Sequence, residues 1–383
     1  MKKAVMYGAG NIGRGFIGKV LSESGYEVCF LDIAQDIIAA FNKDGQYTVK
    51  VVSNEEQRND IVKNVRAVDA NTPQAIKEIA DCDLMATSVG VNVMPYIVGN
   101  IAEGIKMRMK QGNRPLDIIL AENQLDADKI MRNFIYEKLN DEQKAWADKN
   151  LGLVEASIGR MVPPLTADER TQNPLLIAVE EYALLPVDSA AFKGEIPQLV
   201  GIVPYTPFGF YIKRKLFIHN MGHALCAYFG KQAGCEYIWQ AVEIPEVYES
   251  AKKSMECVAQ ALNMEYGVPL EEILDNVTDL LYRFKNKALR DTVARVGGDP
   301  IRKIRKDDRL VGAALYCLEF GLEPTYIVKG IAAALKFYNP NDQSSVKLKE
   351  ELCTKGLEAV MEQYMGLKAD SVLAGMIKKA FEE

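Results

Sequence analysis

The chain has 383 residues, of which 48% are hydrophobic and 26% charged, and its formal net charge is −6. This length suffices for two domains with large cores, and the composition is ordinary for a globular enzyme. The negative charge gives no indication of nucleic acid or an anionic membrane as a partner. No apolar run approaches the length that crosses a bilayer, which argues against a membrane-spanning protein.

Cysteine and histidine usage bears on compartment and metal binding. The seven cysteines are scattered, odd in number and without a Cys-x-x-Cys pair, which is typical of reduced thiols in a cytoplasmic protein. The chain has only two histidines, so a zinc site would need distant Cys or carboxylate ligands and is not expected. The N-terminal residues 1–8 resemble a first strand and not a signal peptide. We therefore expect a cytoplasmic protein without a catalytic metal.

A glycine-rich segment follows the first expected strand, 4–7. Gly8, Gly10 and Gly13 have the G-x-G-x-x-G spacing, in which the glycines allow a tight turn, close approach of a pyrophosphate, and packing of helix on strand. A second strand, 27–31, leads to Asp32, about 20 residues further on, where an acidic side chain would hold the ribose hydroxyls. The alternative is a glycine turn without a ligand. The expected cofactor-binding residues here are Gly8, Ala9, Gly10, Asn11, Ile12, Gly13, Arg14 and Asp32.

The cofactor choice follows from the residues after Asp32. The next Lys or Arg along the chain is Lys43. An acidic side chain without a nearby cation disfavours the 2′-phosphate of NADP. The sequence therefore predicts NAD as the cofactor.

Several further β-like segments are expected in the N-terminal half. They cover residues 46–52 (a hairpin arm), 64–69, 83–89, 116–122, 153–162, 175–179, 182–187 and 199–203. In an open parallel sheet the carboxyl ends of strands line the cofactor crevice, which places Ser88, Val89 and Asn123 there. The alternative for Asn123 is a turn residue that caps the following helix.

Beyond Pro207 the β signals fade and helical periodicity takes over. Helices are expected over roughly 208–231, 236–262, 270–290, 300–320, 324–337, 345–364 and 369–382. The domain boundary is soft, between Pro186 and Pro207, and we place it at 195/196. The predicted fold is α/β: an N-terminal Rossmann-type doubly wound sheet (1–195) followed by an all-α domain (196–383).

The first of these helices carries polar residues in an otherwise apolar sequence. On an α-helical wheel Lys215, His219, His223 and Asn220 span about 140°, and Leu, Phe, Ile and Met fill most of the rest. Such a helix is buried, and buried polar groups need partners or a task. The alternative is a core helix whose lysine extends to solvent and whose histidines bond to nearby carbonyls.

A basic segment lies between Lys285 and Arg309. It contains nine Lys or Arg against four Asp, within a chain of net negative charge. If 300–320 is one helix, Arg302, Arg305 and Arg309 share a face just after its Asp299-Pro300 start. A helix N-terminus with guanidinium groups would suit a phosphomonoester, whereas the alternative is a solvated helix face.

The spacing Lys215-x4-Asn220-x2-His223 resembles the signature of the polyol-specific long-chain dehydrogenases. The glycine loop 8–16 and the segment 299–303 resemble the shorter, sugar-phosphate branch of that family. The resemblance implies NAD-dependent, metal-independent hydride transfer, with Lys215 as base, Asn220 as donor to the alkoxide and His223 as an orienting group.

The same resemblance implies further site residues. It places Asn123 by the nicotinamide and substrate, Arg160 at the mouth of the substrate cleft, and Arg302, Lys303 and Arg305 at the phosphate. The expected partner is a small sugar or polyol phosphate, and the expected state is a monomer or weak homodimer. Three alternatives remain: another polyol or hexuronate dehydrogenase, a short-chain dehydrogenase using Tyr211-x3-Lys215, and a non-catalytic NAD-sensing protein. Tyr364-x3-Lys368 fits the short-chain pattern equally well, which weakens that reading.

Overall fold

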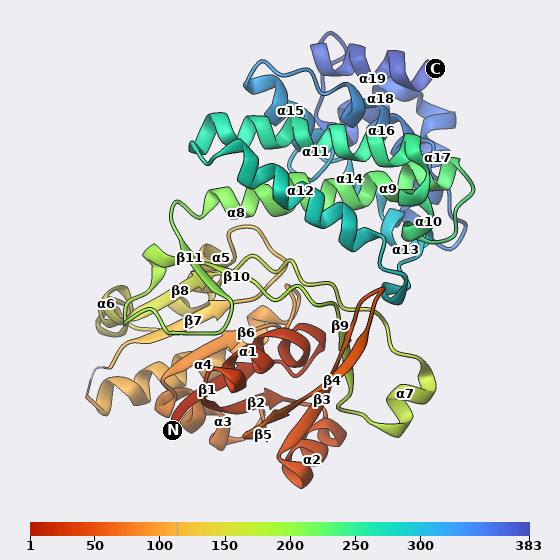
Figure 1. The fold of residues 1–383 in the computed structure, drawn as a ribbon. Helices are drawn as coiled ribbons and strands as arrows, with labels where there is room; N and C mark the ends of the chain where they lie inside the picture. The colour runs from red at the N-terminus through yellow and green to blue at the C-terminus, as the bar shows by residue number, and fades with distance from the viewer. Residues whose placement is uncertain (113) are drawn as a thin grey trace. The chain divides into compact units, whose positions relative to one another are not determined.

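The structure is a computed structural model that describes residues 1–112 and 114–383. The chain divides into two compact units, Met1–Gly209 and Phe210–Glu383, which Figure 1 shows as an α/β unit and a helical unit. In the described part of the chain, no helix is both long and apolar enough to cross a membrane.

The first unit is built on a parallel sheet of six strands in the order β5-β2-β1-β6-β7-β8. The strands are β1 Lys2–Tyr7, β2 Tyr26–Asp32, β5 Val65–Asp69, β6 Leu84–Thr87, β7 Leu116–Leu120 and β8 Leu151–Glu155. The order is that of a doubly wound dinucleotide-binding sheet, in which the strand sequence reverses direction between β1 and β6. The predicted Rossmann-type fold is therefore confirmed.

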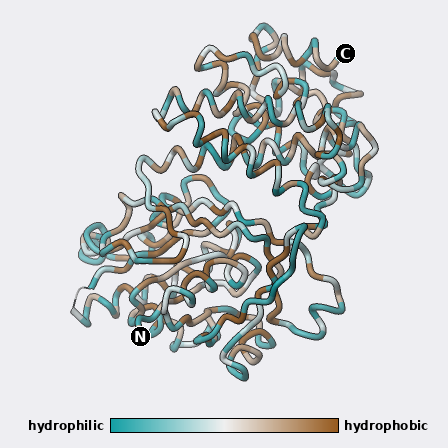
Figure 2. The backbone as a smooth tube through the Cα atoms, in the orientation of Figure 1, coloured by the Kyte–Doolittle hydropathy of each residue, from teal (hydrophilic) through white to brown (hydrophobic). Residues whose placement is uncertain are grey.

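Helices cover both faces of this sheet because its central strands are apolar on both sides. They are α1 Lys19–Glu23, α2 Gln35–Asp44, α3 Pro73–Asp81, α4 Met94–Lys110, α5 Ala127–Tyr136 and α6 Asp141–Asn150. A further short helix, α7 Ala167–Gln172, has no buried residue. Two cores result, one containing residues of α1 and α2, the other residues of α3 to α6. Figure 2 shows the hydrophobic stretches along the strands of this unit.

Two small sheets complete the first unit. β3 (Gln46–Val52) pairs antiparallel with β4 (Gln57–Lys63) and parallel with β9 (Ile177–Val179), so the expected hairpin arm is present. β10 (Leu185–Asp188) pairs with β11 (Ile202–Tyr205). A division at 195/196 would separate these two paired strands, whereas the structure divides the chain at Gly209.

The second unit is helical, as predicted. Its α-helices are α8 Gly209–Lys213 (which starts at the boundary), α9 Met221–Gln232, α10 Ile238–Glu243, α11 Pro245–Tyr266, α12 Leu270–Phe284, α13 Val293–Gly297, α14 Pro300–Lys303, α15 Val311–Glu319, α16 Thr325–Leu335, α17 Gln343–Lys355, α18 Leu357–Val360 and α19 Val372–Glu382. The helix α9 is central, because it packs against α10, α11, α13 and α16.

Two expected helices are interrupted. The helix expected over 236–262 is split before Pro245, because the residue before a proline is held extended and Ile244 has ψ 120°. The helix expected over 300–320 ends at Lys303 and resumes at Val311. Asp308 contributes to this break, since its carboxylate accepts a hydrogen bond from the Arg309 amide at 2.6 Å, a local bond that competes with helix formation.

This interruption corrects one prediction. Arg302 lies in α14, whereas Arg305 and Arg309 lie in the turn between α14 and α15. The three arginines therefore do not share a helical face, and that argument for a phosphate site is wrong.

Candidate functional site

The glycine turn of the first unit has the geometry that a dinucleotide requires. Gly8 has φ +96°, and a Cβ there would lie 2.6 Å from the Ser88 carbonyl oxygen. A Cβ on Gly13 would lie 2.0 Å from the Gly8 carbonyl oxygen. A Cβ on Gly10, by contrast, would meet no described atom within 4 Å. Packing therefore requires the first and third glycines, while the second faces open space where a pyrophosphate can approach the backbone.

The helix after this turn begins at Asn11 and is π-helical over Gly13–Gly18. Its first backbone N–H groups have no partners within the helix, so they are available to an anionic ligand. Ala9 is buried, Ile12 is partly buried and Asn11 is exposed. Arg14 donates from Nη1 to the Pro174 carbonyl oxygen at 2.7 Å. The turn and helix start thus fit the pyrophosphate of NAD.

Asp32 lies at the end of β2 against this turn. Its carboxylate accepts hydrogen bonds from the backbone N–H groups of Ala9 (2.7 Å), Ile33 (2.8 Å) and Ala34 (3.0 Å). A carboxylate has about four acceptor positions, so about one remains for a ribose hydroxyl. The structure adds a cation that the sequence argument missed. Arg14 precedes Asp32 in sequence but lies close enough for the Asp32 charge to raise its pKa, although burial has the larger effect and lowers it.

The ends of β6 and β7 are joined by a residue that the sequence analysis did not single out. Glu122 is buried, and its carboxylate accepts from the N–H groups of Val89 (3.0 Å) and Gly90 (2.8 Å). It thereby holds the predicted crevice residue Val89 and the following Gly90 in place. The sequence feature that could have identified Glu122 is its position at the end of an expected strand.

Asn123 follows Glu122 and is exposed. The alternative reading, that it caps the following helix, is wrong, because the N-cap residue of α5 is Asp126. The role of Asn123 beside the nicotinamide stays a prediction.

Arg160 is placed differently from the expectation. Its guanidinium is buried, donates to the Glu180 carbonyl oxygen (3.0 and 2.8 Å) and the Gly15 carbonyl oxygen (3.2 Å), and lies over the Phe16 ring. Burial lowers its pKa to about 10. These contacts favour a structural role, in which Arg160 supports the helix of the glycine turn, over direct substrate binding.

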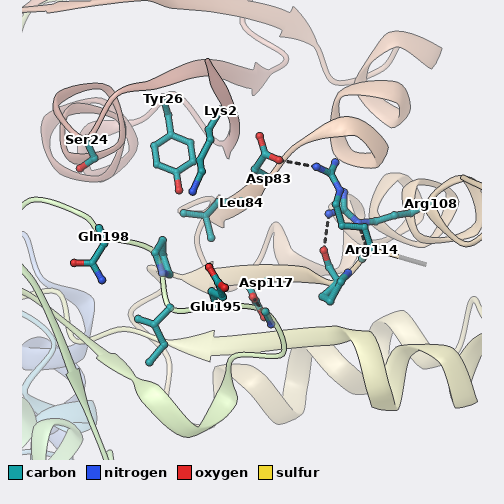
Figure 3. A pocket seen from close by; sticks show the side chains of 14 residues that line it. Lys2, Ser24, Tyr26, Asp83, Leu84, Arg108, Arg114, Asp117, Glu195 and Gln198 are labelled. Carbon is teal, nitrogen blue, oxygen red and sulfur yellow. Dashed lines mark hydrogen bonds and ion pairs between the residues drawn. The ribbon is translucent and has the colours of Figure 1, made fainter. Parts of the chain in front are cut away.

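A cavity of about 680 Å³ lies at the end of the sheet opposite the glycine turn. Its lining includes Lys2, Tyr26, Asp83 and Leu84. Figure 3 shows Lys2 beside Tyr26, and Asp83 turned toward Arg114, with which it forms an ion pair of 2.6 Å. These residues stand at the amino ends of the strands. Cofactors of doubly wound sheets bind at the carboxyl ends, so this cavity is not part of the cofactor site.

In the second unit, Lys215, Asn220 and His223 lie on one continuous helix with an irregular middle. α8 leads into a π-helical segment, Arg214–Asn220, which continues as α9, and the Met221 N–H bonds to the Leu216 carbonyl oxygen. The extent of this helix agrees with the prediction, but the wheel spacing does not. A π turn closes between residues five apart, so Lys215 and Asn220 come nearer to one face than the α-helical wheel implied.

Lys215 is half-buried. Desolvation, followed by the positive charge of Arg309, lowers its pKa to about 8. Desolvation also lowers the pKa of His219 well below its ordinary value, assisted by the charges of Arg283, His223, Lys215 and Arg309. These mutual effects place the basic groups close together, and they keep a substantial fraction of Lys215 neutral near physiological pH. A neutral lysine can act as a base.

His223 is held by a carboxylate that sequence reasoning did not identify. Its Nε2 lies 3.1 Å from Oδ2 of Asp291, and its ring stacks on Phe284 with 4.8 Å between centroids. Burial tends to raise the pKa of Asp291, but the hydrogen bond from His223 and the charges of His223 and Arg295 lower it below its ordinary value. An ionised Asp291 can only accept, so Nε2 carries the proton and Nδ1 remains for a further bond.

Asn220 and Lys213, two polar residues near Lys215 on the same helix, differ in their hydrogen bonds and ion pairs. In the described part of the chain, the Asn220 side-chain amide has no hydrogen-bond partner, so it remains available to a ligand. Lys213 instead forms an ion pair of 2.6 Å with Glu265 and lies over the Tyr316 ring. Lys215, whose pKa burial lowers to about 8, is the better candidate base of the two lysines.

The expected phosphate-binding residues fall into two groups. Arg302 and Arg305 are exposed, with side-chain fractions of 45% and 56%, and form ion pairs with Asp299 and Asp307 respectively. Lys303 is buried against the Gly298 carbonyl oxygen, and burial, then the charges of Arg309 and Arg302, lower its pKa to about 8. Arg309 is 13% exposed and bonds to Asp308. Of these cations, Arg309 is the one whose charge acts on Lys215.

Residues 1–112 and 114–383 contain no group of three or more His, Cys, Asp or Glu side chains that could hold a metal ion. The first unit has a doubly wound sheet whose glycine turn contacts Asp32, and the second unit has a helix that carries a lysine of lowered pKa. Together they define the class of nicotinamide-dependent oxidoreductases.

Comparison with known proteins gives the family. Residues 2–201 match the model of the mannitol dehydrogenase Rossmann domain, and residues 209–383 match that of the mannitol dehydrogenase C-terminal domain. The chain belongs to the mannitol dehydrogenase family, and it binds NAD.

Solved structures share this fold. A D-sorbitol dehydrogenase in substrate-free form matches with TM-score 0.84 and 15% identity, covering 99% of this chain and 91% of the other. The Pseudomonas fluorescens mannitol 2-dehydrogenase, in a ternary complex with NAD and D-mannitol, matches with TM-score 0.72 and 14% identity, covering 100% and 91%. At identities this low, the similarity shows a shared fold alone.

Proposed function

We propose that this protein is a mannitol-1-phosphate 5-dehydrogenase, which interconverts D-mannitol 1-phosphate and D-fructose 6-phosphate with NAD. The observation that carries the proposal is the helical site of the second unit. There Lys215, with a pKa near 8, Asn220, with an available amide, and His223, oriented by Asp291, combine with the largely buried cation Arg309.

Each residue has a defined part in the oxidation of the alcohol. Neutral Lys215 accepts the hydroxyl proton at Nζ. Asn220 donates from its amide to the oxygen as negative charge develops there. His223, with Nε2 bound to Asp291, uses Nδ1 for a hydrogen bond with a substrate hydroxyl and so fixes the orientation of that hydroxyl. NAD, when bound, supplies the hydride acceptor. In the reverse direction protonated Lys215 returns the proton.

The phosphate is the part of the proposal that separates it from other polyol dehydrogenases. Arg309 is largely buried, and its acidic partner among the described residues is the neighbouring Asp308; a guanidinium in this setting suits a charged oxyanion. A phosphate dianion would also compensate the positive charges of Lys303 and Arg302 around it. The local excess of basic residues over acidic ones in 285–309 supports the same conclusion.

A second candidate is a dehydrogenase of an unphosphorylated polyol such as mannitol or sorbitol. The observation in its favour is that Arg302 and Arg305, two of the residues expected at a phosphate, are already paired with Asp299, Asp308 and Asp307. In that case these cations serve the stability of the turn between α14 and α15.

One assay separates the candidates. NADH consumption is followed with fructose 6-phosphate, and in parallel with fructose at the same concentrations. The proposal predicts that kcat/KM is larger for the phosphorylated sugar by about 10–150-fold or more. This range corresponds to one charged hydrogen bond of about 1.5–3 kcal/mol. Equal efficiency with both sugars would favour the second candidate, and no turnover with any polyol or ketose would favour a non-catalytic NAD-binding protein.

Variants then locate the phosphate contact. Arg309→Gln should remove most of the preference for the phosphorylated sugar. Arg305→Gln is the matched control, because Arg305 is exposed and paired with Asp307. A loss of preference in the Arg305 variant alone would move the phosphate to the exposed side of the turn, as the sequence first indicated.

A further inference from the structure

The cavity at the amino ends of the strands contains polar groups that the proposed reaction does not use. It has a volume of about 680 Å³, and all the residues that line it belong to the first unit. This volume is within the range of about 300–1,000 Å³ that is typical of small-molecule sites. The size of the cavity therefore permits a small metabolite, and the chemistry of its lining decides which class of metabolite fits.

Several charged groups build the walls of the cavity. Arg108, on α4, is buried and donates to backbone carbonyl oxygens at 2.8 Å. Asp117, on β7, accepts from two backbone N–H groups of the loop between β10 and β11, at 2.7 and 3.0 Å, and so fixes that loop. Arg114 and Asp83 form an ion pair of 2.6 Å. These charges are compensated within the protein, so their role is to shape the cavity.

Tyr26, on β2, is a buried residue of the lining whose hydroxyl has no such partner. The residue is 4% exposed, and within residues 1–112 and 114–383 its hydroxyl makes no hydrogen bond. Buried tyrosine hydroxyls usually have a partner, because an unpaired buried polar group costs free energy. Burial, followed by the charge of Asp83, raises the pKa of Tyr26. The hydroxyl therefore keeps its proton and can donate it to a ligand in the cavity.

Lys2 and Glu195 add one charge of each sign to the lining. Lys2 lies next to Tyr26, because the two residues are register partners in the parallel pair of β1 and β2. Glu195 lines the cavity from the loop between β10 and β11, and Figure 3 shows it across from Lys2 and Tyr26. Among the described residues, neither Lys2 nor Glu195 forms an ion pair. The cavity thus has a positive charge with a hydroxyl donor on one wall and a negative charge on another.

This arrangement determines the charge of the ligand. A ligand with a single charge would leave the charge of the opposite wall uncompensated, whereas a zwitterion complements both walls. Apolar side chains of Leu84 and Ile196 complete the lining. We propose that the cavity binds a free amino acid with an apolar side chain, whose carboxylate accepts hydrogen bonds from Lys2 and Tyr26 and whose ammonium group pairs with Glu195. This site is separate from the cofactor crevice, so it does not depend on the proposed function.

The test is isothermal titration calorimetry of the full-length protein with L-leucine, L-methionine and L-phenylalanine as probes. We expect at least one of them to bind with one molecule per chain. The matched probes for leucine are isocaproate, which lacks the amine, and isopentylamine, which lacks the carboxylate. Each should bind at least about tenfold more weakly, because each loses a charged hydrogen bond. Saturating NAD should leave the affinity unchanged, since cofactors of doubly wound sheets bind at the carboxyl ends of the strands.

Variants locate the contacts. Tyr26→Phe removes the hydroxyl and keeps the buried ring, and it should raise the Kd of the bound amino acid about tenfold. Lys2→Gln and Glu195→Gln should each do the same. Lys3→Gln is the matched control, because Lys3 is exposed on the same strand and does not line the cavity; its Kd should equal that of the wild type.

Three results would overturn the proposal. The first is that none of the three amino acids binds at concentrations up to about 10 mM, weaker than any affinity of about 4 kcal/mol. The second is that isocaproate or isopentylamine binds as tightly as leucine, or that NAD displaces the amino acid. The third is that Tyr26→Phe and Lys2→Gln bind it like the wild type. All three are binding measurements, so they stand whether or not the protein oxidises a polyol phosphate.

Discussion

Replacing Lys215 with methionine tests the central residue of the proposed site. Methionine removes the amine but keeps a flexible, unbranched side chain, so the packing of the π-helical segment should survive. A positioned base contributes about 10²–10⁴-fold to the rate, which corresponds to about 2.7–5.5 kcal/mol of transition-state stabilisation. The variant should lose activity by at least the lower figure while its affinity for NAD stays near that of the wild type.

The lowered pKa of Lys215 gives this prediction its pH dependence. With a pKa of about 8, about 1% of Lys215 is neutral at pH 6 and half at pH 8. The oxidation rate requires the neutral form, so it should rise about tenfold per pH unit below pH 8 and level off above it. The reduction rate requires the protonated form and should fall above pH 8. Both dependences should disappear in Lys215→Met.

One further variant is a control, and another tests the cause of the lowered pKa of Lys215. Lys213→Met changes a lysine on the same helix that is paired with Glu265, and its pH profile should match that of the wild type. Arg309→Gln removes a positive charge that lowers the Lys215 pKa, so the midpoint of its profile should move to higher pH. The assignment is refuted if Lys215→Met keeps most of the activity with the same pH dependence, in which case His219 or His223 becomes the candidate base.

Three other predictions concern His223, the glycine turn and Asp32. Asp291→Asn weakens the charged hydrogen bond to His223 and should lower kcat/KM by about 10–150-fold, the equivalent of about 1.5–3 kcal/mol; an unchanged value would show that His223 needs no orientation. Gly10→Ala should fold normally but raise the Kd for NAD in a fluorescence titration, whereas Gly13→Ala, where the Cβ would meet the Gly8 carbonyl at 2.0 Å, should lower Tm. Asp32→Ala should narrow the preference for NAD over NADP in kcat/KM, and equal use of both cofactors by the wild type would contradict the reasoning.

Local patterns in the sequence predicted the fold class and the cofactor correctly. The alternation of short apolar strands with helices, and the glycine spacing before Asp32, specify the doubly wound sheet and its cofactor because these signals act over a few residues. The Lys215-x4-Asn220-x2-His223 spacing likewise pointed to the family that the comparisons support. The roles of these three residues in catalysis stay predictions.

The tertiary structure decided which polar groups meet. Asp291 and His223 are far apart in sequence, and their contact exists only because α13 and the turn before it pack against α9. The break between α14 and α15 leaves Arg305 and Arg309 in a turn outside α14, although helical periodicity had placed them on one helical face with Arg302. The burial that lowers the pKa of Lys215 also arises from the packing of segments remote in the chain. Desolvation and charge pairing depend on distances in space, which the order of residues does not contain.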